Sequence, residues 1–262
     1  MPTTKVDEVE IYYEVYGDGE PLILIAGFMG DHTVWGGMLE TLAKRFKVLI
    51  FDNRAVGQTQ DSGKPFSIET LADDAIKLSQ QVGFAKPHIL GQSMGGAVAQ
   101  TIAMKYPQQI NSLIILNSVM KFSVVSQIAM TNLLDLEALK IPADLILNAI
   151  LPWVLSSDFL SVPDNIKMLK KMVMSNPYPQ STENKKRQLA AIELFDSRPW
   201  ANQIKTKTLV IAGEHDVLTP PAQCCHLANQ IPQAIFKIIP GAHASPTEQP
   251  EKVTNEILAF LM

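Results

Sequence analysis

Short apolar runs alternate with longer amphipathic stretches along the first half of the chain. Continuous apolar runs at residues 22–26, 47–51 and 88–90 each end at a Gly or an Asp, and a fourth run lies at residues 113–116. Runs of this length and composition are typical of strands that are buried on both faces. Residues 11–16 alternate instead and lead into a Gly-Asp-Gly turn, as an antiparallel strand would.

Helical spacing fills the segments between these strands. We expect helices over residues 33–45, 67–82 and 94–106, with Ser67 as the N-cap of the second and Pro107 ending the third. A strand, a helix and a further strand in succession form a parallel unit. The pattern therefore predicts an α/β fold with a parallel sheet that is covered by helices on both faces.

The alternation breaks near Val119 and resumes at Thr208. The stretch between them is rich in Leu, Met and Pro. It has helical spacing at residues 127–139, 143–155, 165–174 and 184–195. Helices with no strands between them cannot extend a sheet, so we predict a helical lid over residues 119–207.

The lid is predicted to be an insertion in one core, which comprises residues 1–118 and 208–262. Strands expected at residues 209–212 and 235–239 belong to the second part of this core. A helix lies between these two strands, and another runs from about residue 250 to the end. No internal repeat interrupts this organisation.

The composition limits the classes of protein to which the chain can belong. Of its 262 residues, 47% are hydrophobic and 18% are charged, which excludes a disordered or fibrous chain. The net charge of -4, from 22 Lys plus Arg against 26 Asp plus Glu, argues against nucleic acid as a partner. Cys224 and Cys225 are neighbours and the only cysteines, which excludes a disulfide framework and a cysteine-based metal cluster. Without a signal-peptide pattern or an apolar run of about 18 residues, we expect a cytoplasmic protein with no membrane span.

Residues 91–95 match the pattern G-x-S-x-G, directly after the predicted strand 88–90 and at the start of the following helix. The pattern indicates a nucleophile only in this strand-turn-helix context, because the context places the Ser on a sharp, exposed turn. The flanking glycines let neighbouring backbone approach closely, and the helix N-terminus favours a developing oxyanion. Ser93 is therefore the predicted nucleophile.

A serine hydroxyl needs a base to remove its proton, and the chain offers five histidines. His243 follows the last predicted strand, so its loop lies at the carboxyl ends of the strands, where open α/β sheets hold their sites. His32, near the first strand-to-helix turn, is the second choice. His88 begins a strand and lies at the wrong end, His226 is expected on a helix surface, and His215 is expected to point away.

The base in turn needs a carboxylate to fix its tautomer. Asp216 follows the strand 209–212 and is the predicted acid. Glu214 is a neighbouring alternative, and Asp52 also ends a strand but precedes the Ser in the chain. The order Ser, Asp, His is the one that accompanies this motif.

Two donors are needed for an oxyanion hole. One is the backbone N–H of Met94, next to the nucleophile. The other is expected from Phe28, in the turn of residues 27–30 that follows the first central strand. Phe28 and Met29 would also form apolar walls of the pocket.

Five segments together resemble the α/β-hydrolase superfamily: IAGFMGDHTVW, FDNRAVGQT, GQSMGGAVAQ, LVIAGEHDVLTPP and IPGAHASPTEQP. The resemblance covers nearly the whole chain. It implies a mostly parallel eight-stranded sheet with helices on both faces and an inserted helical lid. It also implies a Ser93, Asp216 and His243 triad, an oxyanion hole from the Phe28 and Met94 amides, and neither metal nor organic cofactor.

Three features depart from the superfamily pattern. The His that precedes the first Gly of the oxyanion turn, and normally braces it, is Ala26 here. Ala55 and Thr59 replace a Gly and a Ser in a structural segment, which bears on packing. Asn117 stands where some dehalogenase-type relatives carry their acid, which favours Asp216, and a Ser nucleophile argues against dehalogenases and epoxide hydrolases.

These observations predict a serine hydrolase that cleaves a small-molecule carboxylic ester or lactone through an acyl-enzyme. Met29, Phe122 and Trp153 are the predicted substrate-binding residues, because the lid is apolar and adaptable. In size and lid the chain is similar to pimeloyl-carrier methyl ester esterases and to 3-oxoadipate enol-lactonases. A cofactor-free perhydrolase and a small-molecule receptor are the remaining alternatives.

A basic stretch interrupts the acidic average of the chain. Its cations are Lys167, Lys170, Lys171, Lys185, Lys186 and Arg187. A solvated helix face explains such a stretch. A docking surface for an acidic carrier protein is the more specific interpretation.

Overall fold

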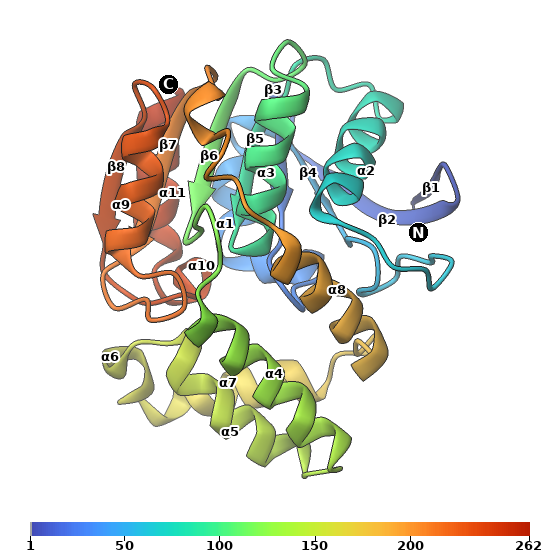
Figure 1. Cartoon of the computed structure of the whole chain (residues 1–262), viewed down its shortest axis with the longest axis vertical. Coiled ribbons are helices and arrows are strands. Elements are labelled where there is room, and N and C mark those ends of the chain that lie inside the picture. Colours follow the sequence, from blue (N-terminus) through green and yellow to red (C-terminus); the bar gives the residue numbers. More distant parts are fainter. Residues whose placement is uncertain (1) are drawn as a thin grey trace.

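In the computed structural model, which describes residues 2–262, eight strands form a single sheet (Figure 1). Their order across the sheet is β1-β2-β4-β3-β5-β6-β7-β8. The strands are β1 (Thr3–Val6), β2 (Val9–Tyr16), β3 (Glu20–Ile25), β4 (Phe46–Phe51), β5 (His88–Gln92), β6 (Ser112–Leu116), β7 (Lys207–Gly213) and β8 (Ile235–Ile239). Only the pairs β1·β2 and β2·β4 are antiparallel, so the prediction of a mostly parallel eight-stranded sheet is confirmed.

Successive residues of the central strands point to opposite faces of the sheet. In β3, Leu22 and Leu24 belong to one hydrophobic core and Ile23 and Ile25 to the other, and all four are fully buried. Burial on both faces explains why these strands have continuous apolar sequences.

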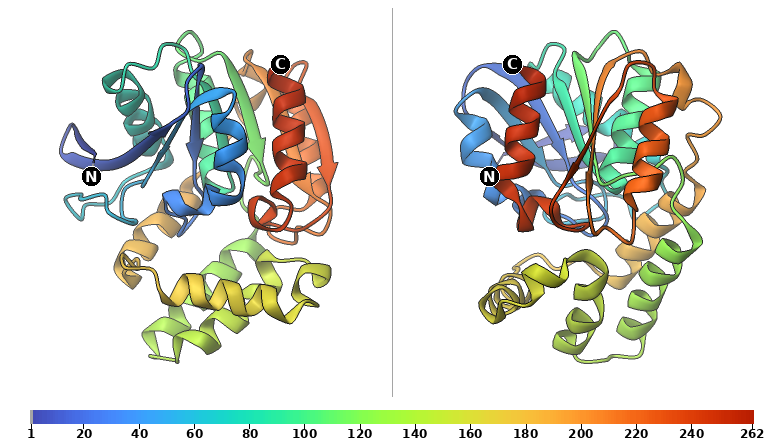
Figure 2. Two further views of the ribbon diagram at one scale, coloured as in Figure 1. Left: turned by 180° about the vertical axis from the view of Figure 1, so that it is seen from behind. Right: turned by 90° about the vertical axis from the view of Figure 1, so that its left-hand side faces the viewer.

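Helices cover both faces of the sheet, as predicted (Figure 2). One face packs against α1 (Gly36–Ala43) and α11 (Pro250–Leu261). The other packs against α2 (Ile68–Gln81), α3 (Met94–Lys105) and α9 (Pro221–Gln230).

The start of α2 lies where its predicted capping residue places it. Ser67 caps α2, because its hydroxyl accepts a hydrogen bond from the backbone N–H of Thr70. The prediction of one helix over residues 33–45 is wrong at its start. There the side chain of Asp31 accepts a hydrogen bond from the N–H of Thr33 and begins a 3-10 turn, η1 (His32–Trp35), ahead of α1.

The helices between β6 and β7 lie together beyond the carboxyl ends of the strands, in the lower half of Figure 1. They are α4 (Val124–Ala138), α5 (Ala143–Val154), α6 (Ser157–Leu160), α7 (Pro163–Met174) and α8 (Thr182–Leu194). We call them the lid helices. The four predicted helical stretches correspond to α4, α5, α7 and α8, and α6 is an additional turn. The division into a core and a separate lid domain stays a prediction.

Two short elements complete the fold. They are η2 (Ala201–Gln203), which precedes β7, and α10 (Ser245–Glu248), which follows β8. Within residues 2–262, no helix has the length and apolar composition that a membrane span requires.

Candidate active site

Ser93 stands on the sharp turn between β5 and α3, with φ of +55° and ψ of -117°. The two glycines of the motif, Gly91 and Gly95, are required because neither position has room for a Cβ atom. A Cβ on Gly91 would come within 2.0 Å of the backbone oxygen of Gly95, and a Cβ on Gly95 within 2.0 Å of that of Ile25. The turn therefore holds Ser93 in a left-handed conformation that is strained for any residue other than glycine.

The structure brings Ser93, His243 and Asp216 into one chain of hydrogen bonds. The Oγ of Ser93 is 2.9 Å from Nε2 of His243, and Nδ1 of His243 is 2.8 Å from Oδ2 of Asp216. The residues come from the loops after β5, β8 and β7 and are nearly buried, with 6%, 8% and 3% of their surfaces exposed. Because a carboxylate only accepts, a neutral His243 in this arrangement has its proton on Nδ1, which leaves Nε2 as the acceptor for the Ser93 hydroxyl.

The carboxylate of Asp216 is held by its own turn. Its Oδ1 accepts hydrogen bonds from the backbone N–H groups of Leu218 and Thr219, both at 2.8 Å, and its Oδ2 accepts one from the Thr219 hydroxyl at 2.6 Å. The spacing Asp-x-x-Thr is a local sequence signal for such a turn, so Thr219 could have been predicted. Glu214, the neighbouring alternative, is exposed.

Asn117 has a structural role that its sequence context does not reveal. Its Nδ2 donates to the backbone oxygens of Ala242 and His243, at 3.2 and 2.8 Å, and to the hydroxyl of Ser245 at 2.8 Å. Its Oδ1 accepts the N–H of Gly213 at 2.7 Å. Asn117 thus ties the end of β6 to the end of β7 and to the loop that carries His243.

The lid helices also bond to the His243 loop. The N–H of Ala244 donates to the backbone oxygen of Val154 at 2.8 Å. One oxygen of Glu248 accepts the N–H of Ala242 at 2.8 Å, and the other accepts the N–H of Ser156 at 3.1 Å. The end of α5 and the start of α6 are therefore fixed against this loop.

The two predicted oxyanion donors flank Ser93. The turn of residues 27–30 is closed by a 3.1 Å hydrogen bond from the N–H of Gly30 to the oxygen of Gly27. A Cβ on Gly27 would lie 3.0 Å from the Cβ of Ser93, so this turn touches the Ser. Within residues 2–262, the N–H groups of Phe28 and Met94 have no protein acceptor, which leaves both free for a ligand.

The other histidines are not brought to Ser93. His32, the second choice as base, has its Nδ1 2.8 Å from Oδ1 of Asp52. His88 bonds to the Ser112 hydroxyl at 2.8 Å and to Glu20 at 3.0 Å. His215 and His226 are exposed, as predicted for His226.

The pairing of His32 with Asp52 predicts a pH-dependent stability. Burial lowers the pKa of His32, but the hydrogen bond and charge of Asp52, with the charges of Asp31 and Glu14, outweigh it and raise the pKa above 6.5. A raised folded pKa means that the protonated imidazole stabilises the fold below about pH 6.5, and that this contribution is lost as the pH rises through the folded value.

We therefore expect His32→Asn to reduce the free energy of unfolding most at about pH 5.5 and least at about pH 8.5. Urea unfolding of both proteins at a series of pH values measures the difference. A difference that stays constant, or that grows with pH, would contradict the pairing.

A cavity of about 500 Å³ opens beside Ser93 and His243, between the strand ends and the lid helices. Its walls include all three predicted substrate-binding residues, Met29, Phe122 and Trp153, and most of its other lining side chains are aliphatic. No Asp, Glu, Lys or Arg is among the described residues that line it. Among residues 2–262, no three His, Cys, Asp or Glu side chains gather closely enough to hold a metal ion.

The cations of the basic stretch in the lid fall into two groups, one buried in ion pairs and one at the surface. Lys185 forms an ion pair with Glu137, and Arg187 forms one with Asp61, so both cations are engaged inside the protein. These two residues therefore do not belong to an exposed basic helix face. Lys167, Lys171 and Lys186 are exposed and Lys170 is half-buried. An acidic carrier protein stays a prediction that concerns these four lysines.

Known proteins of similar sequence and fold are named as hydrolases. A protein of Azorhizobium caulinodans that bears the name "Putative carbamate hydrolase RutD" is 27% identical over 277 residues, which cover 99% of this chain and 98% of its own. A thermophilic esterase from Thermogutta terrifontis is 29% identical, with a TM-score of 0.85 over 99% of this chain and 96% of that one. The enol-lactonase from Burkholderia xenovorans is 25% identical, with a TM-score of 0.86 over 99% of both chains.

The family described as the α/β hydrolase fold matches residues 20–250, which is most of the chain. The matched region begins at β3 and ends at the start of α11. It includes the motif turn and the loops after β7 and β8. The chain therefore belongs to the α/β hydrolase fold family.

Proposed function

We propose that this protein is a serine hydrolase that cleaves a carboxylic ester of an uncharged, apolar acyl group through an acyl-enzyme. The observation that carries the proposal is the hydrogen-bonded chain of Ser93, His243 and Asp216 at the wall of an uncharged cavity. A nucleophile, a base and an orienting carboxylate within hydrogen-bond reach are what acyl transfer requires.

The geometry supports the following sequence of steps. His243 takes the hydroxyl proton of Ser93 through Nε2 while Oγ attacks the ester carbonyl. The free N–H groups of Phe28 and Met94 stabilise the oxyanion, and Asp216 stabilises the imidazolium. The alcohol leaves with the proton from His243. A water molecule, deprotonated by His243, then releases the acid and restores Ser93.

The cavity supports the choice of acyl group. Its volume of about 500 Å³ lies within the usual range of small-molecule pockets. A carboxylate on the substrate would lose its hydration there without gaining a cation as partner, which is strongly unfavourable. The cavity therefore disfavours the 3-oxoadipate enol-lactone, which carries a carboxylate, and is compatible with neutral esters and lactones.

A panel of aryl esters tests this substrate class. Each added methylene gains about 0.8 kcal/mol on burial, so kcat/KM should rise about fourfold per methylene until the cavity is full. Esters of the same length that end in a carboxylate should be at least about 100-fold poorer. The two series are measured by release of the aryl alcohol. Equal kcat/KM for neutral and acidic esters of one length would contradict the assignment.

The same panel separates the alternatives. A carbamate ester and a neutral lactone belong in it because of the named activities of the relatives. A receptor would bind the neutral compounds without turning them over. A perhydrolase would add peracid-dependent halogenation to esterase turnover.

A further inference from the structure

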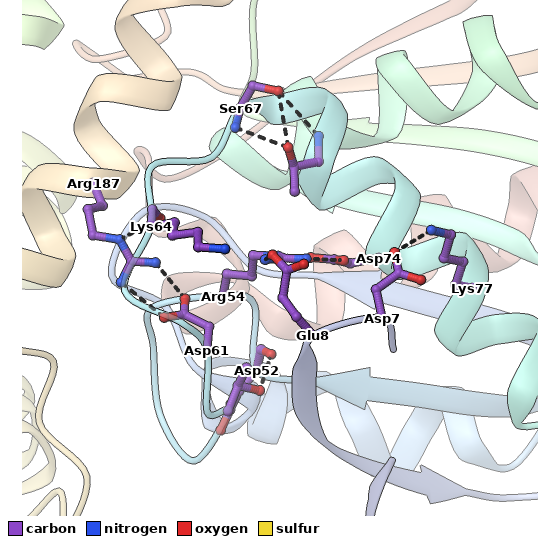
Figure 3. Close-up of polar contacts among 12 residues, drawn as sticks. Asp7, Glu8, Asp52, Arg54, Asp61, Lys64, Ser67, Asp74, Lys77 and Arg187 are labelled. Carbon is purple, nitrogen blue, oxygen red and sulfur yellow. Dashed lines mark hydrogen bonds and ion pairs between the residues drawn. The ribbon is translucent and has the colours of Figure 1, made fainter. Parts of the chain in front are cut away.

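The lid helix α8 is anchored to the core by Arg187 (Figure 3). Its guanidinium group donates two hydrogen bonds to the Asp61 carboxylate, at 3.1 Å from Nη1 and 2.6 Å from Nη2, and a third from Nε to the backbone oxygen of Lys64 at 3.1 Å. Both charged side chains are nearly buried. Because this ion pair is bidentate, it fixes the orientation of the Arg187 guanidinium group as well as its distance from the Asp61 carboxylate. The position of α8 against the core is therefore well defined.

The residue after this anchor, Gln188, reaches the oxyanion turn. It is completely buried. Its Oε1 accepts the backbone N–H of Met29 at 3.1 Å, and its Nε2 donates to the backbone oxygen of Arg54 at 3.2 Å. Both ends of the amide are thus used, and they join α8 to the turn and to the segment after β4.

The hydrogen bond from Gln188 is made at the residue of the turn whose backbone conformation is strained. Met29 has a φ of +63°, a left-handed conformation that favours glycine at the third position of a turn. The peptide between Phe28 and Met29 is the central peptide of this turn, and its N–H is the group that Gln188 holds. Ala26, which stands in place of the bracing His of the superfamily, has no polar side-chain atom that could do this.

We propose that Gln188 is a positioning residue for hydrolysis, which holds the oxyanion turn in its left-handed form and so keeps the N–H of Phe28 directed at the reacting carbonyl oxygen. The inference rests on the proposed function, because an oxyanion forms only if Ser93 attacks a carbonyl. Gln188 is not among the described residues that line the cavity, and its side chain bonds to the turn, so its effect is transmitted through the turn.

The first experiment replaces Gln188 by Leu, which keeps the size and removes both hydrogen bonds. A misplaced donor weakens transition-state stabilisation more than ground-state binding, so kcat should fall about 10- to 100-fold while KM changes by less than about threefold. Gln180→Leu is the matched control. Gln180 also bonds from the lid region to the core, but its Nε2 donates to the backbone oxygen of Ala55 at 2.7 Å and not to the turn. It should leave kcat within about twofold of the original.

The second experiment repeats Gln188→Leu in a Met29→Gly background. Glycine adopts a positive φ without strain, so the turn no longer needs the brace, and the loss in kcat should shrink to less than about threefold. If Gln188 only stabilised α8, the loss would be the same in both backgrounds.

The outcomes separate this inference from the proposed function. An unaltered protein without esterase turnover would overturn both. Normal turnover of the unaltered protein together with an undiminished kcat in Gln188→Leu, or with equal losses in both backgrounds, would overturn the positioning role alone.

Discussion

Replacing Ser93 by Ala is expected to lower kcat for aryl esters by at least about 10⁴-fold and to abolish labelling by a fluorophosphonate. The substitution removes the proposed nucleophilic atom, the Oγ that lies 2.9 Å from Nε2 of His243. Because Ala fits the same backbone turn, the loss should occur without a large change in thermal stability. Release of the aryl alcohol and mass spectrometry of the labelled protein measure the two effects.

Ser161→Ala is a matched control for this experiment. Ser161 is exposed at the end of α6, far along the chain from the motif, and its hydroxyl bonds to the oxygen of Asp158. Activity and labelling should be unchanged in this variant. Continued labelling of Ser93→Ala at another serine would refute Ser93 as the nucleophile.

Asp216→Asn is expected to reduce kcat by about 10⁴-fold while the protein remains folded. The amide oxygen can still accept the N–H groups of Leu218 and Thr219, which preserves the turn. The amide NH₂ then faces Nδ1 of His243, where a carboxylate oxygen lay at 2.8 Å. The imidazole is thereby pushed into the tautomer whose Nε2 carries the proton, so it can no longer accept the proton of Ser93.

Glu214→Gln supplies the comparison for Asp216→Asn. Glu214 is two residues earlier and exposed, so the same loss of one negative charge should change kcat by less than about twofold. Steady-state kinetics measure kcat of each variant, and a thermal unfolding curve shows whether the variant remains folded. Similar losses in both variants would mean that net charge near the loop, and not the orientation of His243, controls the rate.

The sequence was most informative where position along a strand determines position in space. Parallel strands present their carboxyl ends at one edge of a sheet, so residues that follow β5, β7 and β8 had to lie near one another. This is why Ser93, Asp216 and His243 could be predicted as a group. The same reasoning rejected His88, which begins β5 and lies at the opposite edge.

Side chains that bond to distant backbone could not be predicted in this way. Gln188 and Met29 are 159 positions apart, and no periodicity relates them. From its sequence position, Asn117 stood out only as the replacement of an acid. In the structure its amide joins the end of β6 to the end of β7 and to the loop that carries His243. The charges of Lys185 and Arg187 looked like surface charges because a sequence does not show which partner a lid helix meets. The hairpin that adds β1 was not predicted either, because its turn contains Asp7, with a φ of +51°, and no Gly that would mark a left-handed position.

The bonds of the lid helices to the His243 loop have a consequence for how a substrate reaches Ser93. Moving the end of α5 and the start of α6 away from the core breaks the hydrogen bonds of Val154 and Ser156, and with them part of the support of the loop between Ala242 and Glu248. Val154 lines the cavity, and its backbone oxygen holds Ala244, so a shift of this wall that enlarges the cavity also displaces the residue next to His243. The shape of the cavity and the placement of the proposed base are therefore coupled.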